Sequence, residues 1–316
     1  MLNKEKYRAH CAVEKSIPIF SQAWWLDSVC GDDWDVCLVE KGGEIVASMP
    51  YHIKRRHGLV LIIQPPLTQN LGPWMKEYDA SSNKILAREK NLMESLIEQL
   101  PSYHHFRQNW HYKNKNWLPF FWKGFSQTTR YTYVIEDLSD FDNVLSSFDH
   151  SKRKNIKKSE KIVKIAFDIP ADVFYENHKY TLAKQGSKIS YSFDIFQKIY
   201  DRGYKNNSAR TIAAYDEDGN LHGALFVIWD SMSAYDLIST IDPDFRNFGA
   251  ASLLIQEIIK YVSPFVNKFD FEGSMIESVE RSFRQFGATQ TSYHSISRTP
   301  SKAIKIIRAL NEIVSN

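Results

Sequence analysis

Apolar positions in residues 130–316 follow two alternating spacings. Runs in which every second residue is apolar or β-branched predict strands, whereas apolar residues three and four positions apart predict helices. Asp218-Gly219 lies between two strand-like runs and predicts a hairpin. The expected strands are 132–135, 165–167, 211–215, 221–229, 233–240, 268–273 and 292–297, and the expected helices are 141–156, 173–183, 193–200, 254–262 and 303–314.

Residues 1–129 carry a shorter set of the same signals. Two short β-prone runs, 36–39 and 45–49, flank Gly42-Gly43, and a third run follows at 59–63. This arrangement predicts an antiparallel meander. The other expected elements are a helix at 24–30, a helix at 85–100 that stops at Pro101, and a strand at 103–110.

These patterns indicate an α+β chain with two domains. The 316 residues fit two domains of about 150 residues each. We expect domains at 1–129 and 130–316, each a mixed, mainly antiparallel sheet flanked by helices. The second half gives the clearer order of elements.

Charge and cysteine content argue against several classes of protein. The 40 Lys and Arg and 37 Asp and Glu give a net charge of +3, so no bulk field attracts nucleic acid or a membrane, and an anion site requires local clustering. Three cysteines without a Cys-x-x-Cys pair fit a reducing compartment. No apolar run approaches the ~18 residues that span a bilayer, and the amino terminus lacks a signal region. We therefore expect a cytoplasmic protein without a membrane span.

A glycine lies between the expected strand at 233–240 and the helix that follows. The connecting sequence is Arg246-Asn247-Phe248-Gly249-Ala250-Ala251. Glycine and small residues let backbone N–H groups at a helix start approach a ligand, and these donors with the helix dipole favour an anion. A glycine before a helix is also an ordinary turn signal. The anion site predicted here comprises Arg246, Phe248, Gly249, Ala250 and Ala251.

Several segments resemble a known family. Arg-x-x-Gly-x-Ala resembles the acyl-CoA pyrophosphate loop of the GNAT acyltransferases. The segments 269–274 and 283–287 resemble the C-terminal signature of the Fem-type peptidoglycan aminoacyl ligases and their relatives in bacterial polysaccharide loci, which are built from two GNAT-like domains. Residues 151–157 are similar to the basic segment that opens the second domain of that family. The first half fits through Phe20-Ser21-Gln22-x-Trp24-Trp25 and Pro65-Pro66-Leu67-Thr68-Gln69.

The resemblance implies roles for individual residues. Arg153 lies where the family has an arginine that contacts the anionic part of a nucleotide-linked substrate, and a guanidinium grips phosphate oxygens bidentately. Ser151, in the same basic segment, is a further substrate-binding residue that the resemblance implies. Arg284 lies where the Fem pattern has a lysine that steadies charge on the acyl carbonyl. The family pattern also places Trp25, Thr68, Gln69 and Tyr191 near the substrate. An ordinary surface ion pair is the alternative for Arg284.

Two carboxylates and a lysine-rich segment carry further candidate chemistry. Asp270 and Glu272 alternate with phenylalanines, so they face away from the side on which the phenylalanines pack. Burial would raise the pKa of either one and make it a general base; otherwise they pair with Arg281 or Arg284. The segment 152–161 holds six cations in ten positions, which indicates a solvated helix face for most of its lysines. A nucleic-acid-binding helix is disfavoured by the near-neutral net charge and by the lack of aromatic residues between these lysines.

The expected function is acyl transfer onto an amine of a cell-envelope precursor, such as an amino sugar or a peptide linked to a nucleotide. Acetyl-CoA or another acyl-CoA is the first donor, and aminoacyl-tRNA is the second. A non-catalytic module that binds a glycan or nucleotide precursor is the alternative from another class. Metal chemistry is not expected, because His104, His105 and His111 lack a cysteine or carboxylate at ligand spacing.

Tryptophan is distributed unevenly. Seven of the eight tryptophans lie at or before Trp122. They indicate either aromatic platforms for a sugar or extended acceptor chain, or packing in the core, and packing is the better explanation for most of them.

Overall fold

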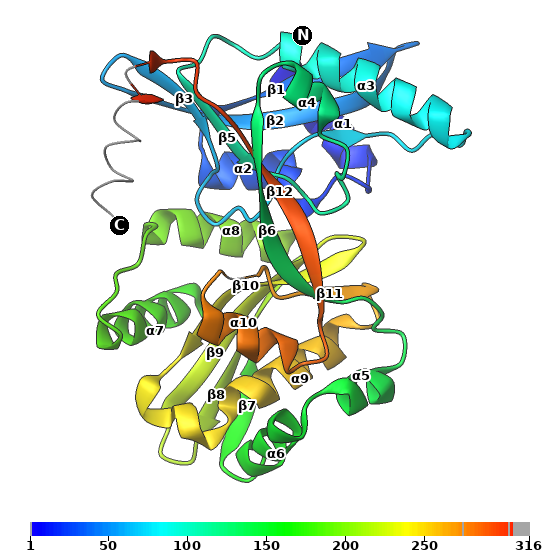
Figure 1. Cartoon of the computed structure of the whole chain (residues 1–316). Coiled ribbons are helices and arrows are strands. Elements are labelled where there is room, and N and C mark those ends of the chain that lie inside the picture. The colour runs from blue at the N-terminus through cyan, green and yellow to red at the C-terminus, as the bar shows by residue number, and fades with distance from the viewer. Residues whose placement is uncertain (1, 274, 303, 306–316) are drawn as a thin grey trace. The chain divides into compact units, whose positions relative to one another are not determined.

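The protein forms two compact units (Figure 1). The computed structural model describes residues 2–273, 275–302, 304 and 305. Unit 1 contains residues 1–130 and the segment that begins at Ser292, and unit 2 contains residues 131–291. The domain boundaries expected from the sequence, 1–129 and 130–316, stay a prediction about independent folding. The helix expected at 303–314 lies outside the described residues except for 304 and 305.

Unit 1 is built on an antiparallel meander, as the sequence predicts. Strands β1, β2 and β3 pair antiparallel in order, β4 pairs with β2, and β5 pairs parallel with β3 and antiparallel with β12. Its elements are α1 (Asn3–Val13), η1 (Ile19–Ser21), α2 (Ala23–Val29), β1 (Trp34–Lys41), β2 (Glu44–Arg56), β3 (Leu59–Ile63), β4 (Trp74–Met75), α3 (Ser82–Glu98), β5 (His105–Asn109), α4 (Leu118–Trp122) and β12 (Thr289–Arg298). The sequence did not predict α1 or α4.

Unit 2 has a sheet with the order β6-β11-β10-β9-β8-β7. Its pairs are antiparallel except β10 with β11. The elements are β6 (Ser126–Ile135), which begins in unit 1, then α5 (Phe141–Ser147), α6 (His150–Ser159), β7 (Val163–Phe167), α7 (Ala171–Lys184), α8 (Phe193–Lys205), β8 (Ala209–Asp216), β9 (Leu221–Trp229), β10 (Ser233–Ile241), η2 (Pro243–Phe248), α9 (Ala250–Val262), β11 (Lys268–Asp270) and α10 (Glu277–Arg284).

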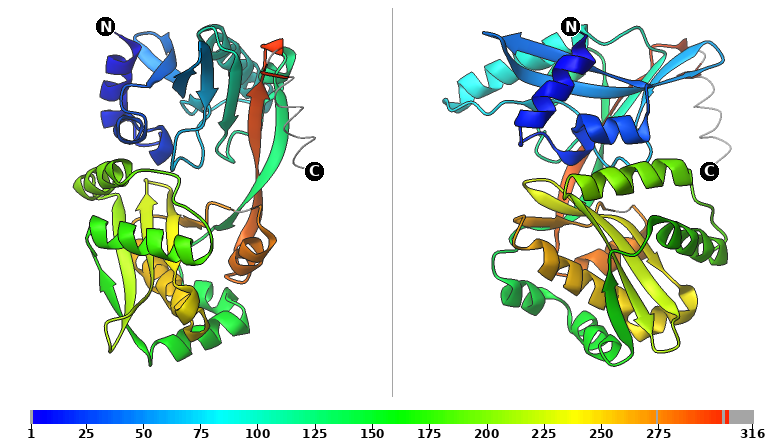
Figure 2. Two further views of the ribbon diagram at one scale, coloured as in Figure 1. Left: turned by 90° about the vertical axis from the view of Figure 1, so that its left-hand side faces the viewer. Right: turned by 180° about the vertical axis from the view of Figure 1, so that it is seen from behind.

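Helices cover both faces of the unit 2 sheet (Figure 2). On one face, α9 buries Leu254, Ile258 and Val262 against strand residues such as Val227. On the other face, Phe226 contacts rings of α7 and α8. Alternation along a strand sends neighbouring residues to opposite faces, so one β9 strand supports both layers. The α+β fold class predicted from the sequence is confirmed.

Two elements differ from the sequence prediction. The single helix expected at 141–156 is two helices, because Phe148 is extended and its ring packs 5.1 Å from that of Phe286. The strand expected at 268–273 ends at Asp270, and Glu272 and Gly273 have φ of 57° and 65°. A Cβ on Gly273 would lie 2.1 Å from the Tyr131 carbonyl oxygen. This close approach requires glycine and turns the chain out of the sheet.

A candidate acyl-transfer site in unit 2

Strands β10 and β11 pair over only three residues. Ser233 to Tyr235 align with Lys268 to Asp270 in the one parallel pair of this sheet. Beyond that point β11 ends, while β10 continues to Ile241 with a register shift between Asp236 and Ile238. A bulge of this kind bends a strand and redirects its side chains. Pairing between β10 and β11 therefore ends at Tyr235, and β10 continues without β11 beside it.

The glycine turn predicted from the sequence lies at the start of α9. Gly249 has φ of 89° and is the N-cap residue of this helix. A Cβ at this position would lie 2.6 Å from the Asn155 carbonyl oxygen in α6, so both backbone conformation and packing require glycine. Ala250 and Ala251 occupy the first turn, where backbone N–H groups lack intrahelical acceptors. Together with the positive end of the helix dipole, these groups form an anion-binding position.

Helix α6 brings a cation to the same turn. The Lys158 ammonium donates to the Asn247 carbonyl oxygen at 2.9 Å and lies 5.4 Å from the centre of the Phe248 ring. Arg246 is exposed at the end of η2. The sequence marked Lys158 only as one cation among six. Its position beside the start of α9 depends on the packing of α6 against this turn.

Asp270 is buried at the point where β10 and β11 part. Its side chain is 1% exposed, and its Oδ1 accepts hydrogen bonds from the Thr132 hydroxyl and from the Glu272 N–H, the latter at 2.8 Å. Burial raises the pKa of Asp270 to about 7. Phe269 and Phe271 pack in the core.

Two more buried carboxyl groups belong to this cluster, and Glu272 is electrostatically coupled to both Asp270 and Asp236. Burial raises the pKa of Glu272 well above its ordinary value, and the charges of Asp270 and Asp236 raise it further. Asp236, at the bulge of β10, is 7% exposed and accepts a hydrogen bond from the Ser239 hydroxyl at 2.7 Å. Its other oxygen has no hydrogen-bond partner among the residues that the structure describes, and burial raises the pKa of Asp236 to about 6. Asp236 was not among the residues predicted from the sequence, although an acid inside the apolar run 234–238 was a usable signal.

The basic segment at the start of α6 packs against the segment at the end of α10. The Asp149 N–H donates to the Gln285 carbonyl oxygen at 2.8 Å, at the start of α6 and the end of α10. Lys152 donates to the Ser282 hydroxyl at 2.8 Å and lies 4.2 Å from the centre of the Phe286 ring. It is 8% exposed, and burial lowers its pKa to about 8. Lys152 therefore does not belong to a solvated helix face.

The two arginines predicted to act on substrate lie on these helices. Arg153 in α6 donates to the Ser146 carbonyl oxygen. Arg284 in α10 pairs with Glu280 at 3.4 Å and keeps 66% of its side chain exposed. Glu280 also accepts a hydrogen bond from the Tyr133 hydroxyl at 2.9 Å. Ser151 is exposed in the first turn of α6.

Part of unit 2 matches a known domain family, and the whole chain matches solved structures. Residues 146–271, which include α6, the Gly249 turn and the β10–β11 pair, match the family described as Acetyltransferase (GNAT) domain. The crystal structure of FemX matches with a TM-score of 0.68 and 12% identity over 93% of this chain and 96% of that chain. The chain has the fold of a Fem-like tandem GNAT protein.

Two further solved structures match over most of this chain. L-PGS from Bacillus licheniformis matches with a TM-score of 0.58 and 10% identity, over 96% of this chain and 94% of that chain. A conserved protein of unknown function from Bacteroides thetaiotaomicron matches with a TM-score of 0.56 and 11% identity, over 93% and 96%. No curated protein sequence is detectably similar to this one. At these identities the likeness concerns the fold.

The predicted substrate residues of unit 1 form a packed local structure. Trp25 has no exposed surface, and its indole N–H donates to the Thr68 hydroxyl at 2.9 Å. Gln64 donates to the Thr68 carbonyl oxygen at 2.9 Å, and Gln69 is half-buried next to it. These bonds fix the segment 64–69 against α2. Substrate contact by Trp25, Thr68 and Gln69 stays a prediction.

Tyr191 lies in an aromatic cluster of unit 2 between α7 and α8. Its ring is 6.0 Å from that of Tyr175 and 6.2 Å from that of His178. Burial raises the pKa of Tyr191 and lowers the pKa of His178 to about 4. The Tyr191 hydroxyl has no hydrogen-bond partner in the described structure. Substrate contact by this tyrosine stays a prediction.

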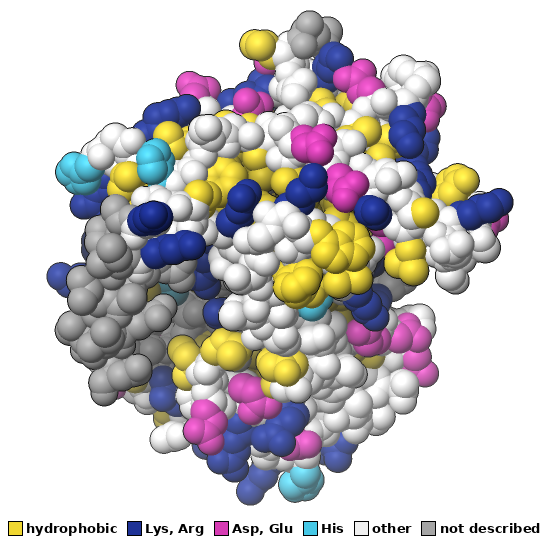
Figure 3. Space-filling view, turned by 45° about the horizontal axis from the view of Figure 1, so that its top comes forward, with side chains coloured by type: hydrophobic (Ala, Val, Ile, Leu, Met, Phe, Trp, Pro, Cys, Tyr) yellow, Lys and Arg dark blue, Asp and Glu magenta, His cyan; other side chains and the backbone are white. Residues whose placement is uncertain are grey.

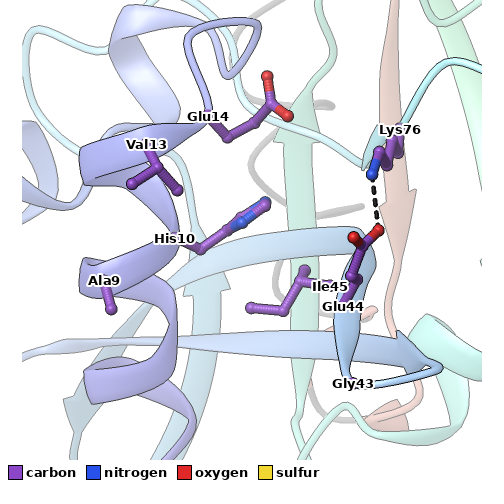
Figure 4. A pocket seen from close by; sticks show the side chains of 8 residues that line it. All are labelled: Ala9, His10, Val13, Glu14, Gly43, Glu44, Ile45 and Lys76. Atoms are coloured by element: carbon purple, nitrogen blue, oxygen red, sulfur yellow. Dashed lines mark hydrogen bonds and ion pairs between the residues drawn. The ribbon is translucent and has the colours of Figure 1, made fainter.

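A surface pocket of about 400 Å³ lies in unit 1, and its lining includes none of the candidate site residues (Figure 4). It lies between α1 and the β1–β2 hairpin, and His10 points into it. Lys76 and Glu44 pair across its rim at 2.7 Å. Within the part of the chain that the structure describes, no helix is long and apolar enough to cross a membrane, and no three His, Cys, Asp or Glu side chains are grouped as metal ligands.

Proposed function

We propose that this protein is an N-acyltransferase that moves an acyl group from a CoA thioester to an amine of a cell-envelope precursor. The observation that carries the proposal is the Gly249 turn, because it combines free helix N-terminal amides, Lys158 and Arg246 inside the segment that matches the GNAT domain. The pyrophosphate of CoA is the anion that this turn would hold. Phe248, Ala250 and Ala251 would supply backbone contacts.

The reaction needs no covalent enzyme intermediate. The amine nitrogen attacks the thioester carbonyl carbon, a C–N bond forms, the C–S bond breaks, and CoA leaves as a thiolate. The amine loses one proton to a base, and the thiolate takes up a proton. Holding donor and acceptor together and stabilising the carbonyl oxygen supply most of the rate enhancement.

Asp270 is the first candidate for the base. A general base works best when its pKa lies near the operating pH, and burial raises the pKa of Asp270 to about 7. Glu272 is the second candidate because it belongs to the same coupled group. Arg284 would act on the developing oxyanion, and Ser151 and Arg153 would hold a phosphate of the acceptor.

The choice of acceptor rests on resemblance. Similarity of the motifs to Fem-type ligases, together with the likeness in fold to FemX and L-PGS, supports an envelope precursor that carries an amine. We place this activity in the cytoplasm. Aminoacyl-tRNA is the second candidate donor, favoured by Asp236, because a buried carboxylate oxygen without a partner suits the ammonium of an aminoacyl group.

Calorimetric titration with CoA and acetyl-CoA tests the proposal. A substitution at Gly249 would disturb α6, so the informative pair is Ala251→Glu and Ala251→Gln. Glutamate at the helix start repels pyrophosphate and should weaken CoA binding about fivefold, because one like charge nearby contributes about 1 kcal/mol. Glutamine has the same size and should change it little. Equal effects of the two substitutions, or no CoA binding at millimolar concentration, would reject the CoA site.

A further inference from the structure

Helix α4 of unit 1 presents large apolar side chains to solvent. Leu118, Phe121 and Trp122 are 51%, 55% and 57% exposed. Phe120 anchors the helix, since it is fully buried with its ring 4.7 Å from that of Trp110. With Phe120 on the buried side of the helix, Leu118, Phe121 and Trp122 lie on its exposed side. We name Leu118, Phe121, Trp122 and the adjacent Leu86 the α4 surface.

The α4 surface extends onto α3. Lys90 of α3 lies 5.4 Å from the centre of the Trp122 ring, and Glu89 accepts a hydrogen bond from Asn116 at 2.9 Å. Leu86, one turn before Lys90, is 54% exposed. Figure 3 shows hydrophobic side chains gathered on the face that bears these helices, with lysine and arginine side chains beside them. A grouped apolar surface of this kind marks an interaction site more often than scattered single residues do.

The charge of the surrounding segment identifies the partner chemistry. Residues 110–124 contain Lys113, Lys115 and Lys123, six aromatic residues and no carboxylate, and all three lysines are exposed. Lys123 and Glu98 approach at 3.4 Å, and both side chains are exposed. Tryptophan and lysine beside an apolar face are typical of segments at a membrane interface. The aliphatic Leu86 and Leu118 fit acyl chains better than stacked bases.

We propose that the α4 surface docks on an anionic lipid membrane, with Phe121 and Trp122 in the headgroup region and the three lysines against lipid phosphates. The site is separate from the acyl-transfer residues of unit 2 and does not depend on the proposed function. Co-sedimentation of the full chain with vesicles tests it, using phosphatidylcholine alone and phosphatidylcholine mixed with phosphatidylglycerol. The wild type binds the mixed vesicles more strongly than the neutral ones.

Variants separate the two contributions. Each lysine near an anionic surface contributes about fivefold to binding, so replacing Lys113, Lys115 and Lys123 with glutamine weakens binding to mixed vesicles about a hundredfold. Phe121→Ser with Trp122→Ser weakens it at least about tenfold. The matched control is Tyr180→Ser with Phe265→Ser, since these side chains of unit 2 are 55% and 52% exposed. This control keeps full binding.

Quenching by brominated lipids locates the contact. Trp122→Phe still binds mixed vesicles but loses most of the quenching of tryptophan fluorescence. The proposal is overturned if the wild type does not sediment with mixed vesicles, if the control variant loses binding equally, or if quenching survives in Trp122→Phe. Loss of binding to unfractionated tRNA in the α4 variants without loss of vesicle binding would also overturn it, in favour of nucleic acid.

Discussion

Lys152 should make the stability of unit 2 depend on pH in an unusual direction. Burial lowers the pKa of this lysine to about 8 from an ordinary value of about 10.5. Between these values the unfolded chain binds the proton more tightly than the folded chain does. Stability therefore rises with pH across this window, because the folded protein no longer holds a buried charge. The penalty is fully present below pH 8.

The pKa difference sets the size of the effect. About 1.4 kcal/mol for each factor of ten in proton affinity gives a total of about 3 kcal/mol. Most of this gain falls above pH 8, with about 1 kcal/mol recovered at pH 9 and most of the total at pH 10. The hydrogen bond to Ser282 and the contact with the Phe286 ring are lost in Lys152→Met, so the variant's stability at any single pH is less informative than the slope.

The assay compares unfolding of unit 2 in the wild type and in Lys152→Met at pH 7, 9 and 10. Hydrogen exchange of peptides from α6 and α10 reports on this unit separately. The free energy of unfolding of the wild type should rise relative to Lys152→Met as pH increases. Lys154→Met, an exposed lysine of the same helix, is the control and should follow the wild type. Parallel pH profiles for the wild type and Lys152→Met would refute the burial argument.

Three further predictions address the site and the fold. Asp270→Asn should lower kcat about 10²–10⁴-fold. In the wild type kcat/KM should rise with pH through about pH 7, where Asp270 loses its proton; the variant should lack this rise, and a variant that keeps it excludes Asp270 as the base. Arg153→Ala should chiefly weaken acceptor binding, whereas Arg284→Ala should lower turnover roughly 10²–10³-fold. Arg281→Ala is the control, because Arg281 is exposed on α10 as Arg284 is, and full activity of the variant with both Arg153→Ala and Arg284→Ala contradicts both roles. Gly273→Ala should lower the free energy of unfolding, measured by urea denaturation, by about 2 kcal/mol or more, because the added Cβ would clash with the Tyr131 backbone. Gly219→Ala, with a similar φ and open space around the added Cβ, is the control and should show only the smaller cost of backbone strain. Equal losses in the two variants would contradict the packing argument.

Local signals carried most of the fold. The hairpin glycines and the alternating runs predicted the meander of unit 1 and the sheet of unit 2 because turn chemistry and side-chain alternation act over a few residues. The Gly249 turn was predictable for the same reason. What the sequence did not show is that Gly249 also meets α6 at Asn155, because that contact joins residues about ninety positions apart.

Contacts distant in sequence decided the remaining residues. The local sequence gives no sign that Lys152 is buried, because its contacts, Ser282 and Phe286, lie about 130 positions later in the chain. The helix expected at 141–156 breaks at Phe148, since its ring has a partner in Phe286 that no local pattern reveals. The buried charge of Asp236 likewise depends on the bulge in β10. Local spacing contains no information about these partners.

The central claim is that the first turn of α9 binds the pyrophosphate of CoA. Amide ¹H–¹⁵N spectra of the protein recorded with increasing CoA test it most directly. The account predicts that the largest shifts fall on the backbone amides of Phe248, Gly249, Ala250 and Ala251, with smaller shifts around Lys158. Unchanged amides at these positions in the presence of saturating CoA, or shifts confined to other elements, would contradict the claim.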